Sequence, residues 1–528
     1  MKFYALKQIE TRRLIIRLVQ LGDEIELNKA INNSLDVLQK WMPWAQDPSL
    51  ETTRNYVQKA VFARASETIK DFAMVVIHKK DQKIIGASGY NDRSDASQGL
   101  YEIGYWCDIS YQGQGYVTEY VNALTRYALS QLEAKLIVIR MHVNNLKSMA
   151  VAERLHFQNQ GIKPSITHPN AKDYYFTCEN LESLPALDCS WKYEKNKKII
   201  KKISKIMAWS KNELKIKDEK AWAGSKAIAQ TPWSEVFEIN TGEKIVYLKQ
   251  TPKDLFLEVE IIKLLSQKSN FKELPTLIKA NKNLCAFIME KSGDLTLREH
   301  FSGKLDQDLF LKAIEIYKNL QKSSINHVDA LIKKGVPDWR LNKFPELYNQ
   351  LISSEKFLTE HGLDAEQQEK LQSNKNQIKN RCEKLSSYKI PECLNHSDFH
   401  DNNMVYDQST KSIAIIDLAE MAINHPFFSI MACLGAVKNT YNLTEEVYQL
   451  LEEQVYSGFL NNQKDLKEIL GLIKILNPLY LLFNQKRFLD SIHLPFDPRN
   501  PISVKQHGRI KQGFMWFIKN IEEKFINL

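Results

Sequence analysis

Two carboxylates and one amide, spaced along a short stretch of chain, have the side chains that phosphoryl transfer requires. The sequence His396-Ser397-Asp398 is followed by Asn403, and Asp417 comes nineteen positions after Asp398. Phosphoryl transfer needs a carboxylate that positions a hydroxyl and accepts its proton, and oxygen ligands that hold Mg²⁺ against the nucleotide phosphates. We predict that Asp398 is catalytic and that Asn403 and Asp417 bind the metal. The alternative is a polar turn without chemistry.

A lysine and a glutamate earlier in the chain would complete this phosphate site. Lys249 ends a predicted strand, and Glu258 follows nine residues later on a predicted helix. A lysine that binds the α- and β-phosphates and a glutamate that pairs with it belong to the kinase arrangement. Glu260 is the competing partner, but Glu258 leaves apolar residues at helical spacing on the inward face. Met289, on the next predicted strand, is expected to meet the adenine. The alternative is a surface lysine and a surface glutamate.

A second group of residues predicts a site for a phosphorylated cofactor. A strand over 101–108 leads into a loop with Gly113 and Gly115, and a helix follows from Thr118. Glycine lets the backbone turn sharply and approach a ligand, and the first N–H groups of a helix have no partner within it. Such a junction is suited to phosphate binding. Taken alone the pattern is a weak signal, and the alternative is a loop that serves only packing.

The sequence around this loop resembles the Gcn5-related N-acetyltransferase (GNAT) family. Within that family it is most similar to the RimJ/RimL-type branch, which acetylates the N-termini of ribosomal proteins. The likeness covers residues 8–182, and its motifs are Trp41 to Trp44, Tyr101 to Glu119, Asn145 to Ser148 and Val151 to Phe157.

The resemblance implies which residues bind acetyl-CoA. The loop amides would hold the pyrophosphate, the end of the preceding strand would splay and bind the pantetheine arm, and Asn145 would lie on the CoA side. The residues assigned to the cofactor are Trp106, Cys107, Gln112, Gly113, Gln114, Gly115, Tyr116, Val117 and Asn145. Because amine acetylation needs a base, the resemblance implies that Glu102 is catalytic. The alternative for Glu102 is a strand carboxylate that hydrogen-bonds to a neighbour.

Two positions depart from the family pattern. Ser110 stands where the family usually has Gln or Arg, and His156 stands where a glycine is usual near the last helix. Neither change removes the loop amides, although His156 could reshape the CoA channel. Cys107 is interpreted as a packed side chain rather than a nucleophile, since the family transfers the acetyl group directly.

The C-terminal half resembles the aminoglycoside phosphotransferase-like family, which has a kinase-like fold. The likeness spans residues 227–495 and includes Ile390-Pro391 before the catalytic stretch and His425 to Ser429 after Asp417. It implies ATP or GTP as phosphate donor, together with Mg²⁺. Because no Ala-Pro-Glu sequence follows Asp417, we expect a small-molecule acceptor rather than a protein.

The elements that position these residues fall into two predicted domains. Residues 1–184 are expected to form an α/β acetyltransferase domain, with a mixed sheet flanked by helices. Residues 185–224 are assigned to a basic linker helix. Residues 225–528 are expected to form an α+β kinase-like domain, with a small β-rich lobe over 225–292 and a large helical lobe over 293–528.

The predicted linker is rich in lysine. Six lysines occur from Lys195 to Lys205, interleaved with isoleucines. One interpretation is an amphipathic helix that binds an anionic membrane or a nucleic acid. The other, which we favour, is a helix whose lysines face water while its isoleucines pack on a domain.

Composition excludes several classes of protein. A chain of 528 residues is too long to fold around one hydrophobic core. Its content of 43% hydrophobic and 26% charged residues is typical of globular proteins. No apolar stretch approaches the roughly 18 residues of a membrane span. Seven scattered cysteines without a CxxC pair indicate reduced thiols, so we expect a cytoplasmic protein. A net charge of +9 permits anionic ligands, but we expect no nucleic-acid partner.

Together these patterns predict a bifunctional transferase, an N-acetyltransferase joined to an O-phosphotransferase. The order of the halves is that of bifunctional aminoglycoside-modifying resistance enzymes, so the first expected acceptor is an aminoglycoside-like molecule with amine and hydroxyl groups. A polycation pocket should be lined with carboxylates, yet Glu420 and Asp490 occur beside Arg487 and Arg509. One alternative is a peptide N-terminal acetyltransferase fused to a metabolite kinase. Another is a regulatory protein in which one half binds its ligand without turnover.

Overall fold

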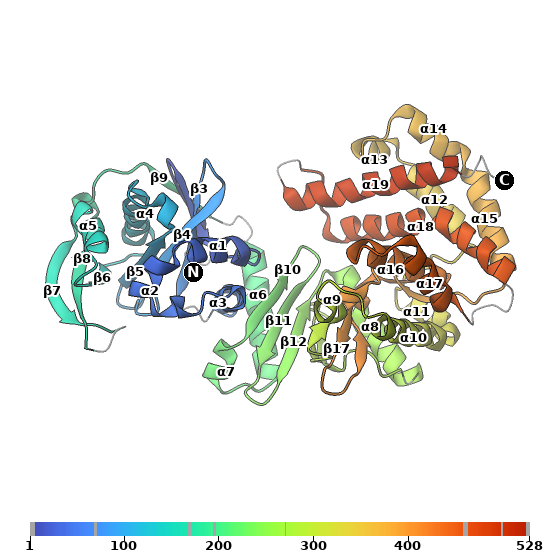
Figure 1. Cartoon of the computed structure of the whole chain (residues 1–528), viewed down its shortest axis with the longest axis horizontal. Coiled ribbons are helices and arrows are strands. Elements are labelled where there is room, and N and C mark those ends of the chain that lie inside the picture. The colour runs from blue at the N-terminus through green and yellow to red at the C-terminus, as the bar shows by residue number, and fades with distance from the viewer. Residues whose placement is uncertain are drawn as a thin grey trace. The chain divides into compact units, whose positions relative to one another are not determined.

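The protein divides into two compact units, each described by itself (Figure 1). The structure is a computed structural model that describes residues 6–67, 71–166, 170–193, 197–269, 271–457, 463–497 and 500–523. Unit 1 is Met1–Gln230 with Glu235–Leu248, and unit 2 is Thr231–Ser234 with Lys249–Leu528. The predicted domain boundaries after residues 184 and 224 lie inside unit 1, and they stay predictions.

A mixed sheet is the main element of unit 1. Among the described residues it has nine strands, in the order β7-β8-β6-β5-β4-β3-β2-β1-β9. The strands are β1 (Leu6–Thr11), β2 (Leu14–Leu18), β3 (Phe72–His78), β4 (Lys83–Tyr90), β5 (Leu100–Cys107), β6 (Leu136–His142), β7 (Gln158–Pro164), β8 (Lys172–Cys178) and β9 (Cys189–Tyr193). The strands predicted over 72–77 and 83–89 are present as β3 and β4. Neighbours are antiparallel except β5 and β6, which are parallel.

Helices cover this sheet because each has one apolar face. The helices are α1 (Glu24–Asn33), α2 (Leu35–Trp41), α3 (Leu50–Ala65), α4 (Tyr116–Gln131) and α5 (Leu146–Arg154). The buried face of α4 includes Tyr120, Leu124 and Tyr127 and packs on β5. Helix α1 lies against β4, and α3 lies against α1. The helix expected from Thr118 begins two residues earlier, at Tyr116.

The two parallel strands separate part-way along their length. Strands β5 and β6 pair only from Leu100↔Leu136 to Glu102↔Val138, although β5 continues to Cys107 and β6 to His142. Asn91 N donates to Glu102 O on the β4 side, so the next residues whose backbone groups face the opening are Ile103 and Tyr105, and these can bind another extended molecule. This opening is the separation of strands that the resemblance implied.

The basic segment is more structured than a plain linker. Strand β9 pairs with β1, and it is followed by α6 (Lys197–Glu213) and α7 (Glu219–Ala223). Ile206 and Met207 of α6 are buried while Lys202 and Lys205 are exposed, which fits a solvated helix packed on its own unit. The chain continues into β10 (Lys226–Gln230), β11 (Glu235–Asn240) and β12 (Ile245–Gln250).

Unit 2 is mostly helical after residue 296. Its strands are β13 (Leu277–Asn281), β14 (Ala286–Glu290), β15 (Leu295–Thr296), β16 (Cys393–His396), β17 (Met404–Tyr406), β18 (Ile413–Ile415) and β19 (Met421–Asn424). Its helices are α8 (Leu257–Leu264), α9 (Leu297–Phe301), α10 (Gln307–Ser324), α11 (Val328–Lys333), α12 (Phe344–Ile352), α13 (Glu355–Glu360), α14 (Ala365–Ser373), α15 (Lys375–Ser387), α16 (Phe427–Thr440), α17 (Glu445–Tyr456), α18 (Gln463–Ile492) and α19 (Pro501–Glu523).

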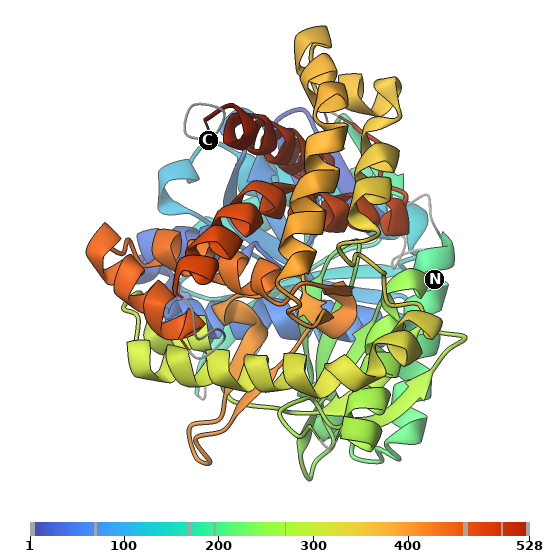
Figure 2. The ribbon, with the colours of Figure 1, turned by 90° about the vertical axis from the view of Figure 1, so that its right-hand side faces the viewer.

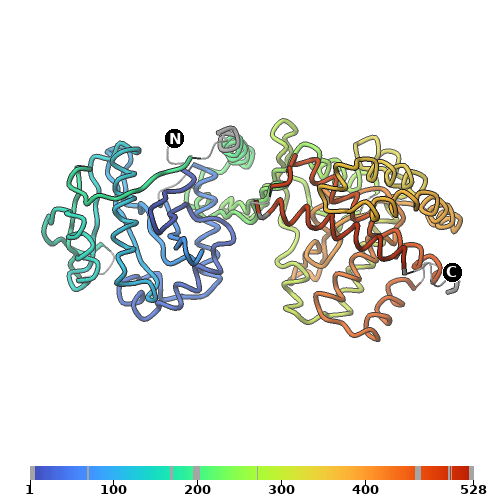
Figure 3. Tube along the Cα trace, turned by 90° about the horizontal axis from the view of Figure 1, so that it is seen from above, coloured from blue at the N-terminus to red at the C-terminus, as the bar shows by residue number. Residues whose placement is uncertain are grey.

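One hydrophobic core joins the helices of unit 2 to the short strands that carry the predicted catalytic residues. Helices α18 and α19 lie side by side in it (Figures 2 and 3). Within the described part of the chain, no helix combines the length and the apolar character that crossing a bilayer would demand.

Candidate active sites

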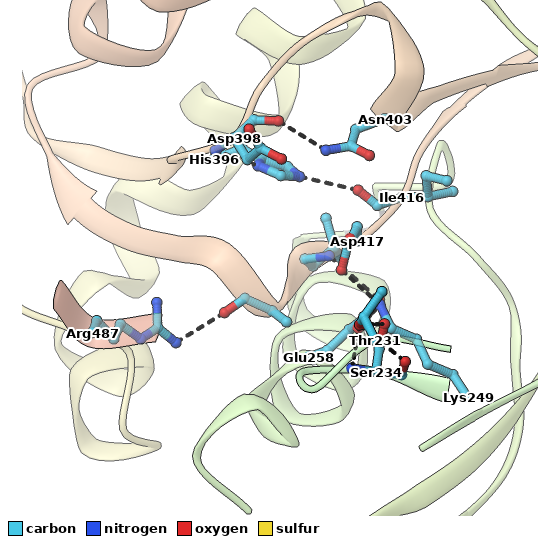
Figure 4. A network of polar contacts seen from close by, with 12 residues as sticks. Thr231, Ser234, Lys249, Glu258, His396, Asp398, Asn403, Ile416, Asp417 and Arg487 are labelled. Atoms are coloured by element: carbon cyan, nitrogen blue, oxygen red, sulfur yellow. Dashed lines mark hydrogen bonds and ion pairs between the residues drawn. The ribbon is translucent and has the colours of Figure 1, made fainter. Parts of the chain in front are cut away.

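Unit 2 brings the predicted lysine, glutamate and metal-binding aspartate into direct contact (Figure 4). Lys249 Nζ lies 2.6 Å from Glu258 Oε2 and 2.7 Å from Asp417 Oδ1. Burial by itself would lower the pKa of Lys249, but Asp417 and Glu258 outweigh it and raise that pKa above its usual range. Lys249 is therefore a fixed cation at the meeting point of β12, α8 and the segment after β18.

The structure also separates the two candidate glutamates. Glu258 is fully buried beside Lys249, and its Oε1 accepts a hydrogen bond from Leu418 N at 3.3 Å. Glu260 instead pairs with Lys334 at 2.7 Å on the surface. Helical spacing explains the difference, because residues two positions apart point in different directions.

The predicted catalytic loop is ordered by its own polar groups. His396 Nδ1 accepts a hydrogen bond from Asp398 N, which leaves the proton on Nε2 to be donated to Ile416 O at 3.1 Å. Asn403 Nδ2 donates to Asp398 O at 2.8 Å. The Asp398 side chain remains 50% exposed, and His400 Nε2 lies 3.3 Å from its carboxylate. Asp398 is therefore held in place while its carboxylate stays accessible.

Two oxygen atoms in this region fit a hard metal ion. The hydrogen bond from Asn403 Nδ2 leaves its Oδ1 available as a ligand, and Asp417 contributes a carboxylate. Asp417 adopts φ 61° and ψ 48°, a left-handed conformation that is uncommon outside glycine and often found at functional sites. Burial would raise the pKa of Asp417, but Lys249 lowers it, so the carboxylate is ionised.

The adenine-contacting role of Met289 stays a prediction. Met289 lies on β14, pairs across the sheet with Leu277 of β13, and packs against Phe256 and Phe287.

In unit 1 a cavity of about 1480 Å³ occupies the opening between β5 and β6. Of the residues assigned to the cofactor, those that line it are Trp106, Cys107, Gln112, Gly113, Gly115, Tyr116, Val117 and Asn145. Asn145 also caps α5, accepting a hydrogen bond from Ser148 N at 3.2 Å. Burial raises the pKa of Cys107 to about 12, so its thiol stays protonated at neutral pH and is a poor nucleophile.

The glycine loop has the geometry of an anion cradle. Gly113 and Gly115 have φ of 76° and 81°, which side chains other than glycine rarely adopt, and Gly115 is the N-cap of α4. Arg13 donates to Gln114 O at 3.0 Å and pairs with Glu119 at 2.6 Å, which fixes the loop to the first turn of the helix. The unpaired N–H groups of that turn and the nearby guanidinium both favour a bound phosphate.

Glu102 is surrounded by cations rather than free. It is 1% exposed, and its Oε1 lies 2.5 Å from Arg93 Nη2 and accepts a hydrogen bond from Asn91 at 3.0 Å. Arg140 Nε lies 3.0 Å from Oε2. This arrangement corresponds to the alternative of a carboxylate bonded to its neighbours. The catalytic role predicted for Glu102 remains untested.

Comparison with known proteins identifies this first unit. The profile described as "Acetyltransferase (GNAT) domain" matches residues 13–158. The ribosomal-protein-serine acetyltransferase of Escherichia coli K12 is 35% identical over 125 residues, which is 24% of this chain and 67% of that protein. This chain belongs to the GNAT acetyltransferase family.

A further relative and a solved structure are also similar to part of this chain. The ribosomal N-acetyltransferase YdaF of Bacillus subtilis, itself a provisional assignment, is 27% identical over 28% of this chain and 79% of that protein. A crystal structure of the Salmonella typhimurium acetyl transferase that modifies the N-terminal serine of ribosomal protein L7/L12 is 24% identical. It covers 32% of this chain and 96% of that one, with a TM-score of 0.29.

The departures of this GNAT unit from the family pattern have local explanations. His156 has φ 58°, so it adopts the left-handed conformation that the usual glycine would take, and its Nδ1 lies 2.9 Å from Ser183 O. Ser110 Oγ accepts a hydrogen bond from Asn33 at 3.0 Å. Neither residue occurs among those that line the cavity.

Sequence reasoning missed several partners of both sites. In the GNAT unit these are Arg13, Asn91, Arg93 and Arg140. In unit 2, Arg298 and Tyr441 hold the buried Asp401 beside the catalytic loop, and Asn484 donates to Glu420 at 2.6 Å. No local pattern marks them: Asn91 and Arg93 lie in the loop before β5, and the other pairs join segments far apart in the chain.

Proposed function

We propose that the chain catalyses two group transfers, an acetyl-CoA-dependent N-acetylation in unit 1 and a nucleotide-dependent O-phosphorylation in unit 2. Membership of the GNAT family and the cavity between β5 and β6 support the first reaction. The observation that carries the second is Lys249 held between Glu258 and Asp417 at 2.6 and 2.7 Å.

In the acetylation site, the first turn of α4 would bind the pyrophosphate of acetyl-CoA, and Arg13 would add a positive charge beside it. The pantetheine arm would extend along β5 past Trp106. The backbone groups of Ile103 and Tyr105, which face away from β4, would pair with the amides of the arm, as one strand pairs with another. The acceptor amine would then attack the thioester from the far end of the cavity.

The acceptor that we favour for unit 1 is a protein or peptide N-terminus. The names of the E. coli and Salmonella relatives give N-terminal or ribosomal-protein serine as their acceptor. The aminoglycoside acceptor stays a prediction without such support.

In the phosphorylation site, Lys249 would bind the α- and β-phosphates of ATP or GTP, and Glu258 would hold the lysine in position. Asp398 would orient the acceptor hydroxyl and accept its proton. Asn403 and Asp417 would hold Mg²⁺, which when bound neutralises charge on the phosphates.

Charge near Asp398 bears on the acceptor of this second reaction. Burial, together with Asp398 and Asp417, raises the pKa of Glu420 well above its ordinary value, while Asn484 and Arg487 oppose the rise. Arg509 lowers the pKa of Asp398, after larger effects of burial and the two histidines. A glutamate that ionises less readily than usual and a nearby arginine favour an uncharged or anionic hydroxyl compound over a polycation.

A screen of acceptors with both donors would test the proposal. The full-length protein is incubated with acetyl-CoA, or with ATP or GTP and Mg²⁺, and with a serine-initiated peptide, an aminoglycoside, a hexose or an amino alcohol. Products are found by mass shifts of about 42 and about 80 Da for acetyl and phosphoryl groups. Nucleotide binding without any phosphorylated product would favour the regulatory alternative for unit 2.

A further inference from the structure

Three polar residues that line the GNAT cavity form a row across the sheet. Phe72 of β3 pairs with Tyr90 of β4, so Asp71 and Asn91 are at the same level of neighbouring strands. Asn91 N donates to Glu102 O, which places Glu102 at that level on β5. All three residues line the cavity. Two strand spacings separate Asp71 from Glu102, about 10 Å along the sheet.

This row is where the reactive end of acetyl-CoA would lie, an argument that rests on the proposed acetylation. The pyrophosphate site is at the C-terminal end of β5, and the free backbone of β5 runs back from there to Glu102, where pairing with β6 resumes. A pantetheine arm bound along this segment therefore directs its thioester toward Glu102. The acceptor amine must reach the same point.

Carboxylates that line the cavity differ in what they bind. Among the described residues they are Asp47, Asp71, Glu102, Glu119 and Asp173. Three of them are engaged, as Asp47 accepts from Thr52 and Ser49, Glu102 contacts Arg93 and Arg140, and Glu119 pairs with Arg13.

The remaining two carboxylates differ in position. In the strand register, Asp173 of β8 lies opposite His142 of β6, whereas Glu102 lies opposite Val138. His142 is four residues further along β6 than Val138. Four residues of extended strand correspond to about 13 Å, so Asp173 lies far from the row. Asp71 lies in the row.

Asp71 has an environment suited to proton transfer. It makes no hydrogen bond or ion pair with any residue in the described ranges. Asp71 is exposed where it lines the cavity, and Tyr56 of α3 is a further titratable group that interacts with it. Partial burial raises the pKa of Asp71 to about 6, Asp92 adds to the rise, and Arg93 opposes it. A carboxylate with this pKa is mostly ionised at pH 7 and binds a proton more tightly than an ordinary aspartate does.

We infer that Asp71, rather than Glu102, is the general base of the acetyl transfer. The amine nitrogen attacks the thioester carbonyl and forms the C–N bond, while the C–S bond breaks and its electron pair leaves on the CoA thiolate. Because Asp71 lies about 10 Å along the sheet from Glu102, the amine is placed between the two, and the Asp71 carboxylate takes the proton that the nitrogen loses through a bridging water and later releases it to solvent through the cavity. Glu102, Arg93 and Arg140 form the fixed wall against which the amine is placed.

The test compares two isosteric variants of the full-length protein, with a hexapeptide carrying a free N-terminal serine as acceptor. Asp71→Asn should lower the turnover number on the order of 10²- to 10³-fold and remove the rise in rate as pH increases through about 6. Asp92→Asn, which removes the neighbouring exposed carboxylate, should keep the rate and shift that rise to lower pH. Binding of acetyl-CoA, measured by calorimetry, should be unchanged in both variants and shows that each is folded.

Two results would overturn the inference. One is an Asp71→Asn protein that binds acetyl-CoA and keeps both its rate, within about threefold, and its rise near pH 6. The other is an Asp92→Asn protein whose rate rises with pH at the same pH as the rate of the wild-type protein. If the wild-type protein binds acetyl-CoA but does not acetylate the peptide, the proposed acceptor is wrong. The same pH comparison is then made on basal hydrolysis of acetyl-CoA, in which water replaces the amine and needs the same base.

Discussion

Each of the two sites contains a cluster of ion pairs, and the charge at the centre of the cluster is of opposite sign in the two. In unit 2 one cation, Lys249, lies between two carboxylates at 2.6 and 2.7 Å. In unit 1 one carboxylate, Glu102, lies between two guanidinium groups at 2.5 and 3.0 Å. A buried charge is tolerated only when partners compensate for its lost hydration, and both clusters meet that condition.

The charge left over differs between the two clusters. In unit 2 it is negative, and together with burial it raises the pKa of nearby Glu420 well above normal. A divalent cation bound there would be stabilised by the same excess. In unit 1 the excess charge is positive, and Glu102 is already paired with Arg93 and Arg140. A position near a cavity therefore does not make a glutamate a base, because its partners decide its role.

Removing the accessible carboxylate of unit 2 should have the largest effect. Asp398→Asn should lower phosphoryl transfer on the order of 10³-fold, because the acceptor hydroxyl loses its proton acceptor. Nucleotide binding should persist, since Lys249 and Asp417 remain paired. Transfer is measured by mass spectrometry of the product and binding by calorimetry. Asp407→Asn, at the half-buried residue before the exposed turn of residues 408–410, is the matched control and should transfer at the normal rate. Equal rates in both variants would remove Asp398 from the mechanism.

Removing the shared carboxylate of unit 1 should mainly affect stability. Glu102→Gln leaves Arg140 without its anion and Arg93 with only the exposed Asp92, and we expect a loss of about 3 kcal/mol in the free energy of unfolding. The measurement is denaturant unfolding followed by tryptophan fluorescence. Asp92→Asn removes only an exposed contact 3.7 Å from Arg93 and should change stability by less than about 0.5 kcal/mol. A Glu102→Gln protein of normal stability without acetyl transfer would restore Glu102 as the base.

The same contrast explains how much the sequence could predict. The unit 2 residues occur in a fixed local spacing, so Asp398, Asn403, Asp417, Lys249 and Glu258 could be named before any contact was known. In unit 1, Arg93 lies nine residues before Glu102 and Arg140 thirty-eight residues after it, and nothing in either segment marks them as its partners. The residues that meet in a site were thus easier to predict than the ion pairs that set its charge.

The fold shows the same limit. Alternating apolar patterns were sufficient to predict β3 and β4, because each is a hairpin strand with a buried face. Strand β9 was missed, since it lies beside the basic segment and its partner β1 is about 180 residues earlier in the chain. Its short alternating pattern cannot be distinguished from an extended linker without that partner.

Replacing the two glutamates of α8 one at a time tests which of them holds Lys249 in the unit 2 cluster. Glu258→Gln leaves Lys249 paired with Asp417 alone, so we expect the lysine to shift and phosphoryl transfer to fall on the order of 10²-fold. Glu260→Gln removes only the surface pair with Lys334 and should leave transfer unchanged. Turnover numbers of the two variants are compared with saturating nucleotide. The reverse order of effects would assign the lysine partner to Glu260.

The smallest expected effect concerns the backbone of the unit 1 loop. Gly115 has φ 81°, and an alanine there costs about 1–2 kcal/mol, so Gly115→Ala should weaken acetyl-CoA binding roughly tenfold as the loop relaxes away from its cradle geometry. Gly161→Ala is the matched control, because φ is 87° there with open space around it, on the exposed strand β7. It should carry the same backbone strain and a similar loss of stability, yet bind acetyl-CoA normally in calorimetry. Equal weakening in both variants would mean that general destabilisation, and not the loop amides, accounts for the effect.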